Sequence, residues 1–241
     1  MHPVGGASSR IAFALDFHDV DAAREVARAV APSVGMLKVG LELFTAAGSR
    51  GVDLGRELGL PVFLDLKLHD IPETVDRAVA RVAAHGARYV TVHASGGPAM
   101  LRRATARARN EGTGLEVVAV TVLTSMDAAE LARTGVSATP LDHVRRLASL
   151  AFEEGVRAFV CSPREVATLR GDLGAGVTLI TPGIRPSSHD DDQKRVATAT
   201  QAIKDGADWL VVGRPIRDAA DPAEAASALA REVLTALSMG A

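Results

Sequence analysis

Two ionisable side chains interrupt an apolar segment, Val62 to Leu68, that otherwise has the composition of a buried strand. Because side chains alternate across a strand, Asp65 and Lys67 should point to the same side of it, together with His69 just beyond. Asp70 follows within reach of the same space. Charges removed from water are costly unless they are paired. We therefore expect a carboxylate and an ammonium that serve catalysis, with a structural ion pair as the alternative.

Further polar residues end or follow other predicted strands. Each of them has a purely structural explanation as an alternative. Asp16 could cap the next helix, Lys38 could extend to the surface, and Thr124 with Ser125 could belong to a turn. However, the carboxyl ends of parallel strands meet at one face of a barrel, where catalytic residues collect. Their common position therefore predicts one polar site. Its candidate members are Asp16, Lys38, Asp65, Lys67, Thr124, Ser125, Arg185, Gly213 and Arg214.

Two segments that combine glycine with arginine predict a phosphate site. They are Thr181 to Pro186, which includes Pro182, and Val212 to Pro215. Glycine lets backbone N–H groups approach phosphate oxygens, and arginine supplies a charged fork of donors. In eight-stranded α/β barrels the loops after strands seven and eight commonly bind phosphate. Gln193 could donate one more hydrogen bond, while the acidic run 190–192 should face solvent.

Short apolar runs alternate with amphipathic stretches along the chain, which favours parallel strands joined by helices. Eight such runs without a break in composition predict a single α/β domain over residues 1–241, a (β/α)8 TIM barrel, with residues 1–9 as a flexible extension. A doubly wound open sheet is the alternative, but no glycine-rich dinucleotide loop follows the first strand. The predicted strands are 11–17, 36–44, 62–68, 89–94, 117–123, 158–161, 178–184 and 209–212, and the predicted helices are 21–31, 72–85, 98–110, 141–154 and 222–237.

The composition narrows the class of protein. A net charge of −2 and an aromatic content of 3% do not favour nucleic-acid binding. The sequence contains neither a signal-like apolar run near its start nor a stretch long enough to span a membrane, so we expect a cytoplasmic protein. Cys161, the single cysteine, should be an inert core thiol. The arginines at 102, 103, 107 and 109 are expected to decorate a solvated helix face without binding anything.

The sequence motifs resemble those of the orotidine 5′-phosphate decarboxylase family over nearly the whole chain. The most specific match is Asp65-Leu66-Lys67-Leu68-His69-Asp70-Ile71-Pro72-Glu73-Thr74. Lys38-Val39-Gly40, Thr181-Pro182-Gly183-Ile184-Arg185 and Asp192-Gln193-Lys194-Arg195 also match. The chain departs from the family pattern at Glu73, where asparagine is frequent, and its spacing from Arg185 to Gln193 is about one residue shorter than in many bacterial members.

The resemblance implies a cofactor-free decarboxylation of orotidine 5′-phosphate to UMP in pyrimidine biosynthesis, with no metal site. By that resemblance Lys38, Asp65, Lys67 and Asp70 form an alternating network, and Lys67 donates a proton to C6. Family members are homodimers, and Asp70 would reach into the neighbouring subunit's site. The resemblance further implies that Asp16, Lys38 and Thr74 hold the ribose, that Thr124 and Ser125 hold the pyrimidine, and that the phosphate is bound by Arg185, Gln193, Gly213 and Arg214.

Two other functions remain as alternatives. A metal-dependent sugar-phosphate decarboxylase or aldolase of the same barrel superfamily can share the Asp-x-Lys-x-x-Asp stretch and would use Mg²⁺ to stabilise an enediolate. A barrel that binds nucleotide phosphates without turning them over is the second alternative. Lys38 in the second strand and the arginines after strands seven and eight favour the decarboxylase.

Overall fold

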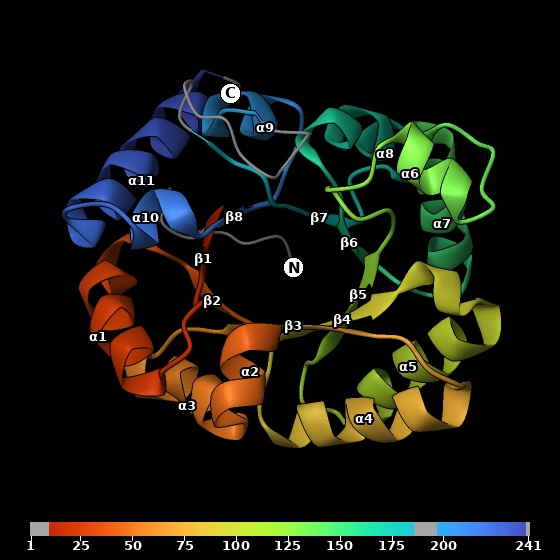
Figure 1. Ribbon diagram of the computed structural model, residues 1–241, viewed down its shortest axis with the longest axis horizontal. Coiled ribbons are helices and arrows are strands. Elements are labelled where there is room, and N and C mark those ends of the chain that lie inside the picture. The colour runs from red at the N-terminus through yellow and green to blue at the C-terminus, as the bar shows by residue number, and fades with distance from the viewer. Residues whose placement is uncertain (1–9, 186–196, 240–241) are drawn as a thin grey trace.

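Eight short parallel strands close into a barrel in the computed structural model, which describes residues 10–185 and 197–239 (Figure 1). Each strand pairs with the next along the chain, and β8 pairs with β1 through Ile11 opposite Leu210. The predicted (β/α)8 TIM barrel is confirmed, and the open doubly wound sheet is wrong. The strands are β1 Ile11–Ala14, β2 Met36–Gly40, β3 Val62–Leu68, β4 Tyr89–His93, β5 Glu116–Val120, β6 Ala158–Val160, β7 Thr178–Thr181 and β8 Trp209–Val212.

Helices surround the barrel in the order of the chain (Figure 1). The α-helices are α1 Val20–Val30, α2 Leu41–Ala47, α3 Ser49–Leu58, α4 Pro72–Ala84, α5 Pro98–Asn110, α6 Ala128–Arg133, α7 Pro140–Glu153, α8 Val166–Leu173, α9 Ala199–Lys204, α10 Arg214–Arg217 and α11 Pro222–Ser238. Short 3₁₀ turns are η2 Ala31–Ser33, η3 Ala94–Gly96 and η4 Pro163–Glu165. None of the helices in the described ranges is long and apolar enough to cross a membrane.

Several strands end earlier than the sequence predicted. The first ends at Ala14 rather than at residue 17, and the second at Gly40 rather than at residue 44. The reason is that the apolar run continues into the next element, where Leu15 and Leu43 are fully buried in the core. An apolar run thus marks burial, which a loop or a helix can provide as well as a strand.

The core has two parts. The larger fills the space between the strands and the helices, and the smaller fills the barrel with inward side chains such as Ala12, Met36, Phe63 and Trp209. Two residues further along β2 and β3, the same inward faces continue to Lys38 and Asp65. The apolar barrel interior therefore supports the charged groups from below, as alternation along each strand requires.

Helix capping leaves Asp16 available for the site. Asp19 is the N-cap of α1, because its Oδ1 accepts hydrogen bonds from the N–H groups of Asp21 (3.0 Å) and Ala22 (2.9 Å). Asp16 makes an ion pair with Lys38 instead. The alternative that Asp16 caps the helix is therefore wrong.

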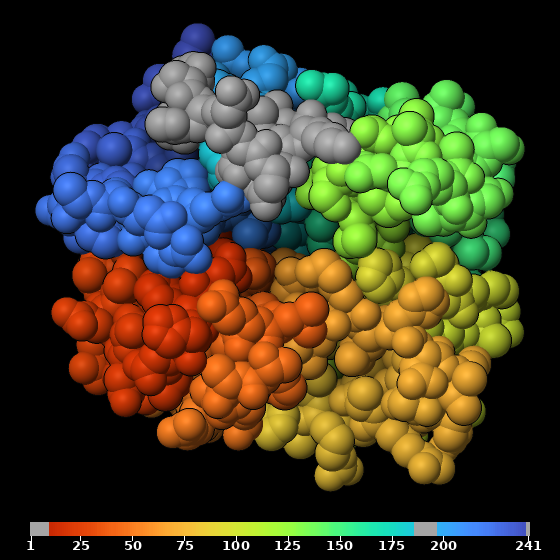
Figure 2. Space-filling model, viewed as in Figure 1, coloured from red at the N-terminus to blue at the C-terminus, as the bar shows by residue number. Residues whose placement is uncertain are grey.

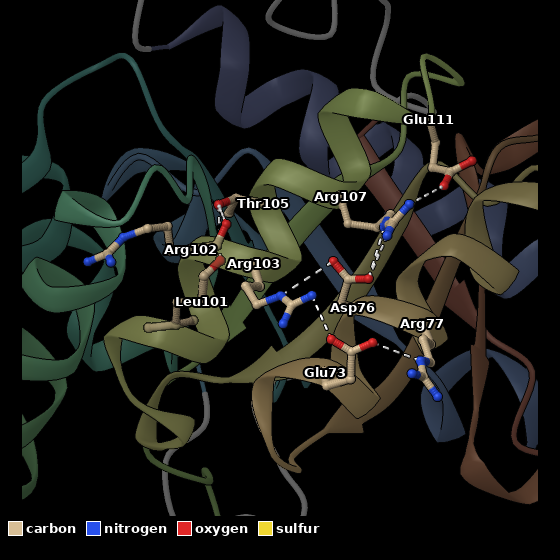
Figure 3. A network of polar contacts seen from close by, with 9 residues as sticks. All are labelled: Glu73, Asp76, Arg77, Leu101, Arg102, Arg103, Thr105, Arg107 and Glu111. Carbon is tan, nitrogen blue, oxygen red and sulfur yellow. Dashed lines mark hydrogen bonds and ion pairs between the residues drawn. The ribbon is translucent and has the colours of Figure 1, made fainter.

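The arginines of α5 do more than face solvent. Figure 3 shows Arg103 and Arg107 reaching across to acidic residues of α4. Arg107 lies 2.7 Å from Asp76, and Arg103 lies 2.7 Å from Glu73. These side chains are partly exposed, as expected of a solvated helix face, but the ion pairs were not predicted, because amphipathic spacing alone does not show that the neighbouring helix presents complementary carboxylates. We call Glu73, Asp76, Arg77, Arg103, Arg107 and Glu111 the α4–α5 cluster.

Cys161 is completely buried, and this burial raises the pKa of its thiol to about 12. The expectation of an inert core thiol agrees with this environment, since only the thiolate is reactive. The predicted flexible extension 1–9, the acidic run 190–192 and Gln193 lie outside the described residues.

Candidate active site

A cavity of about 450 Å³ opens at the carboxyl ends of the strands. Figure 2 shows the face of the molecule from the same side as Figure 1, with the N-terminal half of the chain below and the C-terminal half above. Both halves contribute to the cavity. Of the predicted site residues, those that line it are Asp16, Lys38, Asp65, Lys67, Thr124, Pro182, Arg185, Gly213 and Arg214.

The charged residues of β1, β2 and β3 form a chain of alternating sign. Lys38 Nζ lies 3.0 Å from Asp16 Oδ1 and 3.9 Å from Asp65 Oδ2, and Lys67 Nζ donates to both oxygens of Asp65 at 2.9 Å. The side chains of Lys38 and Asp65 are only 11% and 14% exposed, whereas that of Lys67 is 31% exposed and faces the cavity. We call Asp16, Lys38, Asp65 and Lys67 the mouth cluster. Its outermost cation is thus available to a bound molecule.

Strand β3 is irregular where it carries these groups. Leu64 pairs with Val90 and Leu68 with Val92, so residues 65, 66 and 67 lie opposite the single residue Thr91. Lys67 has a φ of 51°, the only positive φ of a non-glycine residue in the described ranges. Such strain occurs at functional sites when the surrounding structure enforces it. Asp65 and Lys67 do share a direction, as predicted, but through a bulge rather than through plain alternation.

The mouth cluster keeps Asp65 ionised. Burial alone would raise the pKa of its carboxyl group, but the ammonium groups of Lys38 and Lys67 outweigh burial and lower the pKa below its usual value of 3.8. Hydrogen bonds from Lys67 and Thr91 act in the same direction. The site therefore holds a buried carboxylate between two cations.

Glycines permit the close packing around these charges. A side chain at Gly40 would place its Cβ 3.0 Å from Lys38 Nζ, and one at Gly213 would place its Cβ 3.3 Å from Asp16 Oδ2. Gly213 also precedes Arg214, and Arg185 is buried beyond the end of β7. The arginines and the ammonium groups line the same cavity. This arrangement suits an anionic ligand.

Several predicted residues lie elsewhere. Asp70 and Thr74 are exposed at the start of α4, and in the described part of the chain neither they nor Ser125 line the cavity. The Asp70 carboxylate accepts a hydrogen bond from the N–H of Ile71 at 2.6 Å. His69 does not join Asp65 and Lys67; its ring lies 5.4 Å from that of His93. The bulge at Lys67 redirects the segment, which simple alternation could not predict.

Three residues at the site were missed by the sequence reading. Glu42 and Arg217 line the cavity, and Arg217 Nη1 donates to the carbonyl oxygen of Asp16 at 2.9 Å. Their signal was weak but present, because Arg217 is one helical turn after Arg214 and Glu42 follows Gly40 in the first turn of α2. Thr91 is hidden in the apolar run of β4 and gave no signal.

Among residues 10–185 and 197–239, no group of three histidine, cysteine or acidic side chains is placed to hold a metal ion. The carboxylates of the mouth cluster are already engaged by lysines.

The model of the family described as orotidine 5′-phosphate decarboxylase / HUMPS matches residues 9–229. The chain is 54% identical over 224 residues to orotidine 5′-phosphate decarboxylase of Anaeromyxobacter sp. (strain K), covering 92% of this chain and 97% of that protein. It is 51% identical over 227 residues to the Thermobifida fusca protein of the same name, covering 92% and 95%. The solved structure of orotidine 5′-phosphate decarboxylase from Lactobacillus acidophilus superposes with a TM-score of 0.81 at 33% identity, over 92% of this chain and 98% of that one.

Proposed function

The chain belongs to the orotidine 5′-phosphate decarboxylase family, and we propose that it converts orotidine 5′-phosphate to UMP with Lys67 as the proton donor. It is thus a carboxy-lyase of pyrimidine biosynthesis. The observation that supports the role of Lys67 is its ammonium group, which faces the cavity while both oxygens of Asp65 hold it at 2.9 Å.

The chemistry explains why a fixed ammonium is needed. When the bond between C6 of the pyrimidine and the carboxylate breaks, its electron pair stays on C6 in the plane of the ring and cannot spread into the π system. Preorganised positive charge is then the available form of stabilisation. Lys67 places that charge beside the carbanion and then transfers a proton from Nζ to C6. The neutral amine regains a proton from solvent after UMP leaves.

Asp65 and Lys38 prepare Lys67 for this step. The two oxygens of Asp65 stabilise the charged form of Lys67 and hold it in one position. Lys38, between Asp16 and Asp65, compensates the buried carboxylate from its other side. Repulsion between Asp65 and the substrate carboxylate would raise the free energy of the bound substrate, but we rank stabilisation of the carbanion above this effect.

The remaining residues are proposed to bind the rest of the nucleotide. Arg185, Gly213 and Arg214, with Pro182 beside them and Gln193 from the undescribed segment, would surround the phosphate. Asp16 and Lys38 would bind the ribose, and Thr124 with Ser125 the pyrimidine. The phosphate is remote from C6, yet its binding energy can fix the ring for reaction.

We further propose a homodimer in which Asp70 completes the site of the partner. Asp70 and Thr74 are exposed and do not line the cavity of their own chain, and the neighbouring Ile71 side chain is 66% exposed. An acidic and a hydroxyl group beside an exposed apolar residue fit a surface that a second copy covers. From this position Thr74 would reach the ribose in the partner's site. A cytoplasmic location stays a prediction from the sequence.

The test follows the ultraviolet change as orotidine 5′-phosphate becomes UMP, with and without EDTA. We expect turnover that EDTA does not change, because Lys67 rather than a metal ion stabilises the carbanion. Loss of turnover with EDTA would favour the metal-dependent decarboxylase or aldolase. Tight UMP binding without release of CO2 would favour a nucleotide-binding barrel without activity.

A further inference from the structure

We propose that Thr91 is a positioning residue, whose buried hydroxyl holds the backbone of Lys67 and the carboxylate of Asp65 in their reactive arrangement. The inference rests on the proposed function, because it concerns the placement of the proton donor. Thr91 lies on β4, behind the mouth cluster, and its side chain is completely buried.

The hydroxyl makes two hydrogen bonds of opposite sense. It accepts from the backbone N–H of Lys67 at 2.7 Å and donates to Asp65 Oδ1 at 3.0 Å. A hydroxyl has one hydrogen to give and lone pairs to accept with, so both bonds can exist together. Asp65 Oδ1 in turn accepts from Lys67 Nζ at 2.9 Å. One buried oxygen atom therefore closes a ring of contacts that joins the main chain and the side chain of Lys67.

The bulge in β3 explains why this hydroxyl is needed. Residues 65, 66 and 67 lie opposite Thr91 alone, so the regular ladder of backbone bonds is interrupted there. The N–H of Lys67 would remain without its ladder partner, and a buried unpaired donor is costly. The Thr91 hydroxyl takes the place of the absent carbonyl. It also stabilises the left-handed conformation of Lys67, whose φ is 51°.

The consequence for catalysis follows from geometry. Without the hydroxyl, Lys67 can relax toward an ordinary extended backbone, and Asp65 loses one of the donors that fix its carboxylate. A shift of about 1 Å in a reacting group can cost about 100-fold in rate. The phosphate wall, formed by Arg185 beyond β7 and Arg214 at the start of α10, would be unaffected. Loss of the hydroxyl should therefore lower kcat far more than it raises KM.

The experiment compares four variants with the wild type in the decarboxylation assay, each with its melting temperature. Thr91→Val removes the hydroxyl and keeps the shape, and we expect kcat to fall about 10- to 100-fold with KM changed less than about 3-fold. Thr91→Ser keeps the hydroxyl and should retain kcat within about 5-fold. Thr91→Ala differs from Thr91→Ser by one oxygen atom, so this pair tests the idea even if the valine variant fails to fold.

Thr105→Val is the matched control. Thr105 lies on α5, away from the mouth cluster, and is also buried. Its hydroxyl donates to the carbonyl oxygen of Leu101 at 3.0 Å. It should lose stability without losing kcat. The proposal is overturned if Thr91→Ala has the same kcat as Thr91→Ser, or if kcat falls as far in Thr91→Ser as in Thr91→Val. It is also overturned if the substitutions change KM and leave kcat unchanged. Absence of turnover in the wild type would instead refute the proposed function, whatever the variants do.

Discussion

The mouth cluster and the α4–α5 cluster are both networks of acids and bases, yet their surroundings differ. In the mouth cluster the carboxylate of Asp65 is almost buried and is shared by two lysines, one of which, Lys67, has a left-handed backbone. In the α4–α5 cluster, arginines from a regular helix cover Glu73 and Asp76 (Figure 3). The side chain of Asp76 is buried as well, at 9% exposed, but those of Arg103 and Arg107 are 46% and 37% exposed and keep contact with water. Only the first network directs a cation into a cavity.

The difference shows how to separate chemistry from architecture among charged residues. Exposed ion pairs contribute about 0–1 kcal/mol each and are easily replaced. A buried charge costs desolvation free energy even when it is paired, and both clusters contain a buried carboxylate, so burial alone does not separate them. A strained backbone and a place in the cavity coincide at Lys67, whereas Arg107 has neither the left-handed backbone nor a position in the lining of that cavity. Changes in the mouth cluster should therefore affect turnover, and changes in the α4–α5 cluster should affect stability.

The largest effect is expected for Lys67→Ala. The variant lacks both the positive charge beside C6 and the proton to be transferred, so we expect turnover to fall by at least about 10⁴-fold. UMP should still bind, because the phosphate wall and Lys38 remain. Single-turnover conversion of orotidine 5′-phosphate, with UMP binding measured by calorimetry, checks this. Turnover near that of the wild type would refute the proton-donor role.

A smaller effect is expected for Arg214→Ala. The variant loses a charged contact to the phosphate worth about 1.5–3 kcal/mol, so kcat/KM should fall about 10- to 100-fold. Steady-state kinetics measures this, with Arg231→Ala as control because Arg231 pairs with Glu224 on α11, away from the cavity. An unchanged kcat/KM would remove Arg214 from the phosphate site.

The fold and most of the mouth cluster could be predicted from the sequence. Periodic apolar runs indicated the barrel, and the placement of Asp16, Lys38, Asp65 and Lys67 at strand ends indicated the mouth cluster. Strand order brings Asp16, Lys38 and Asp65 to one end of the barrel, whereas the direction of Lys67 depends also on the bulge in β3.

The remainder depends on contacts between distant segments. The bulge opposite Thr91 arises from the register of β3 against β4, and no local pattern encodes it. The pairing of Arg107 with Asp76 likewise joins two helices whose relative position only the fold determines. Asp70 and Thr74 lie outside the cavity of their own chain, so the role proposed for them depends on a second copy, which a single sequence does not display.

Asp76→Asn tests the other side of the comparison. Asp76 is buried and accepts two hydrogen bonds from Arg107, and removing its charge should cost about 1 kcal/mol, because the partly exposed arginines can turn to water. For a chain of this size that corresponds to a fall of about 2–4 °C in melting temperature. Calorimetry and the activity assay check this together, with Glu111→Gln as a control at a weaker 3.4 Å contact. A loss of turnover in Asp76→Asn at unchanged stability would break the comparison.

The smallest effect is the pH dependence of the difference in unfolding free energy between the wild type and Asp76→Asn. The hydrogen bonds from Arg107 lower the pKa of Asp76 below its usual 3.8, so the folded state favours the ionised carboxylate. A carboxyl group with a lowered folded pKa contributes its stability above the unfolded pKa and loses it as the pH falls through the folded pKa. The gap in unfolding free energy between the wild type and Asp76→Asn should thus be constant from about pH 7 to about pH 5 and shrink below about pH 4. Urea unfolding followed by circular dichroism at several pH values measures this gap. Shrinkage already between pH 7 and pH 5 would show that another group, and not the Asp76 carboxylate, carries the contribution of the α4–α5 cluster.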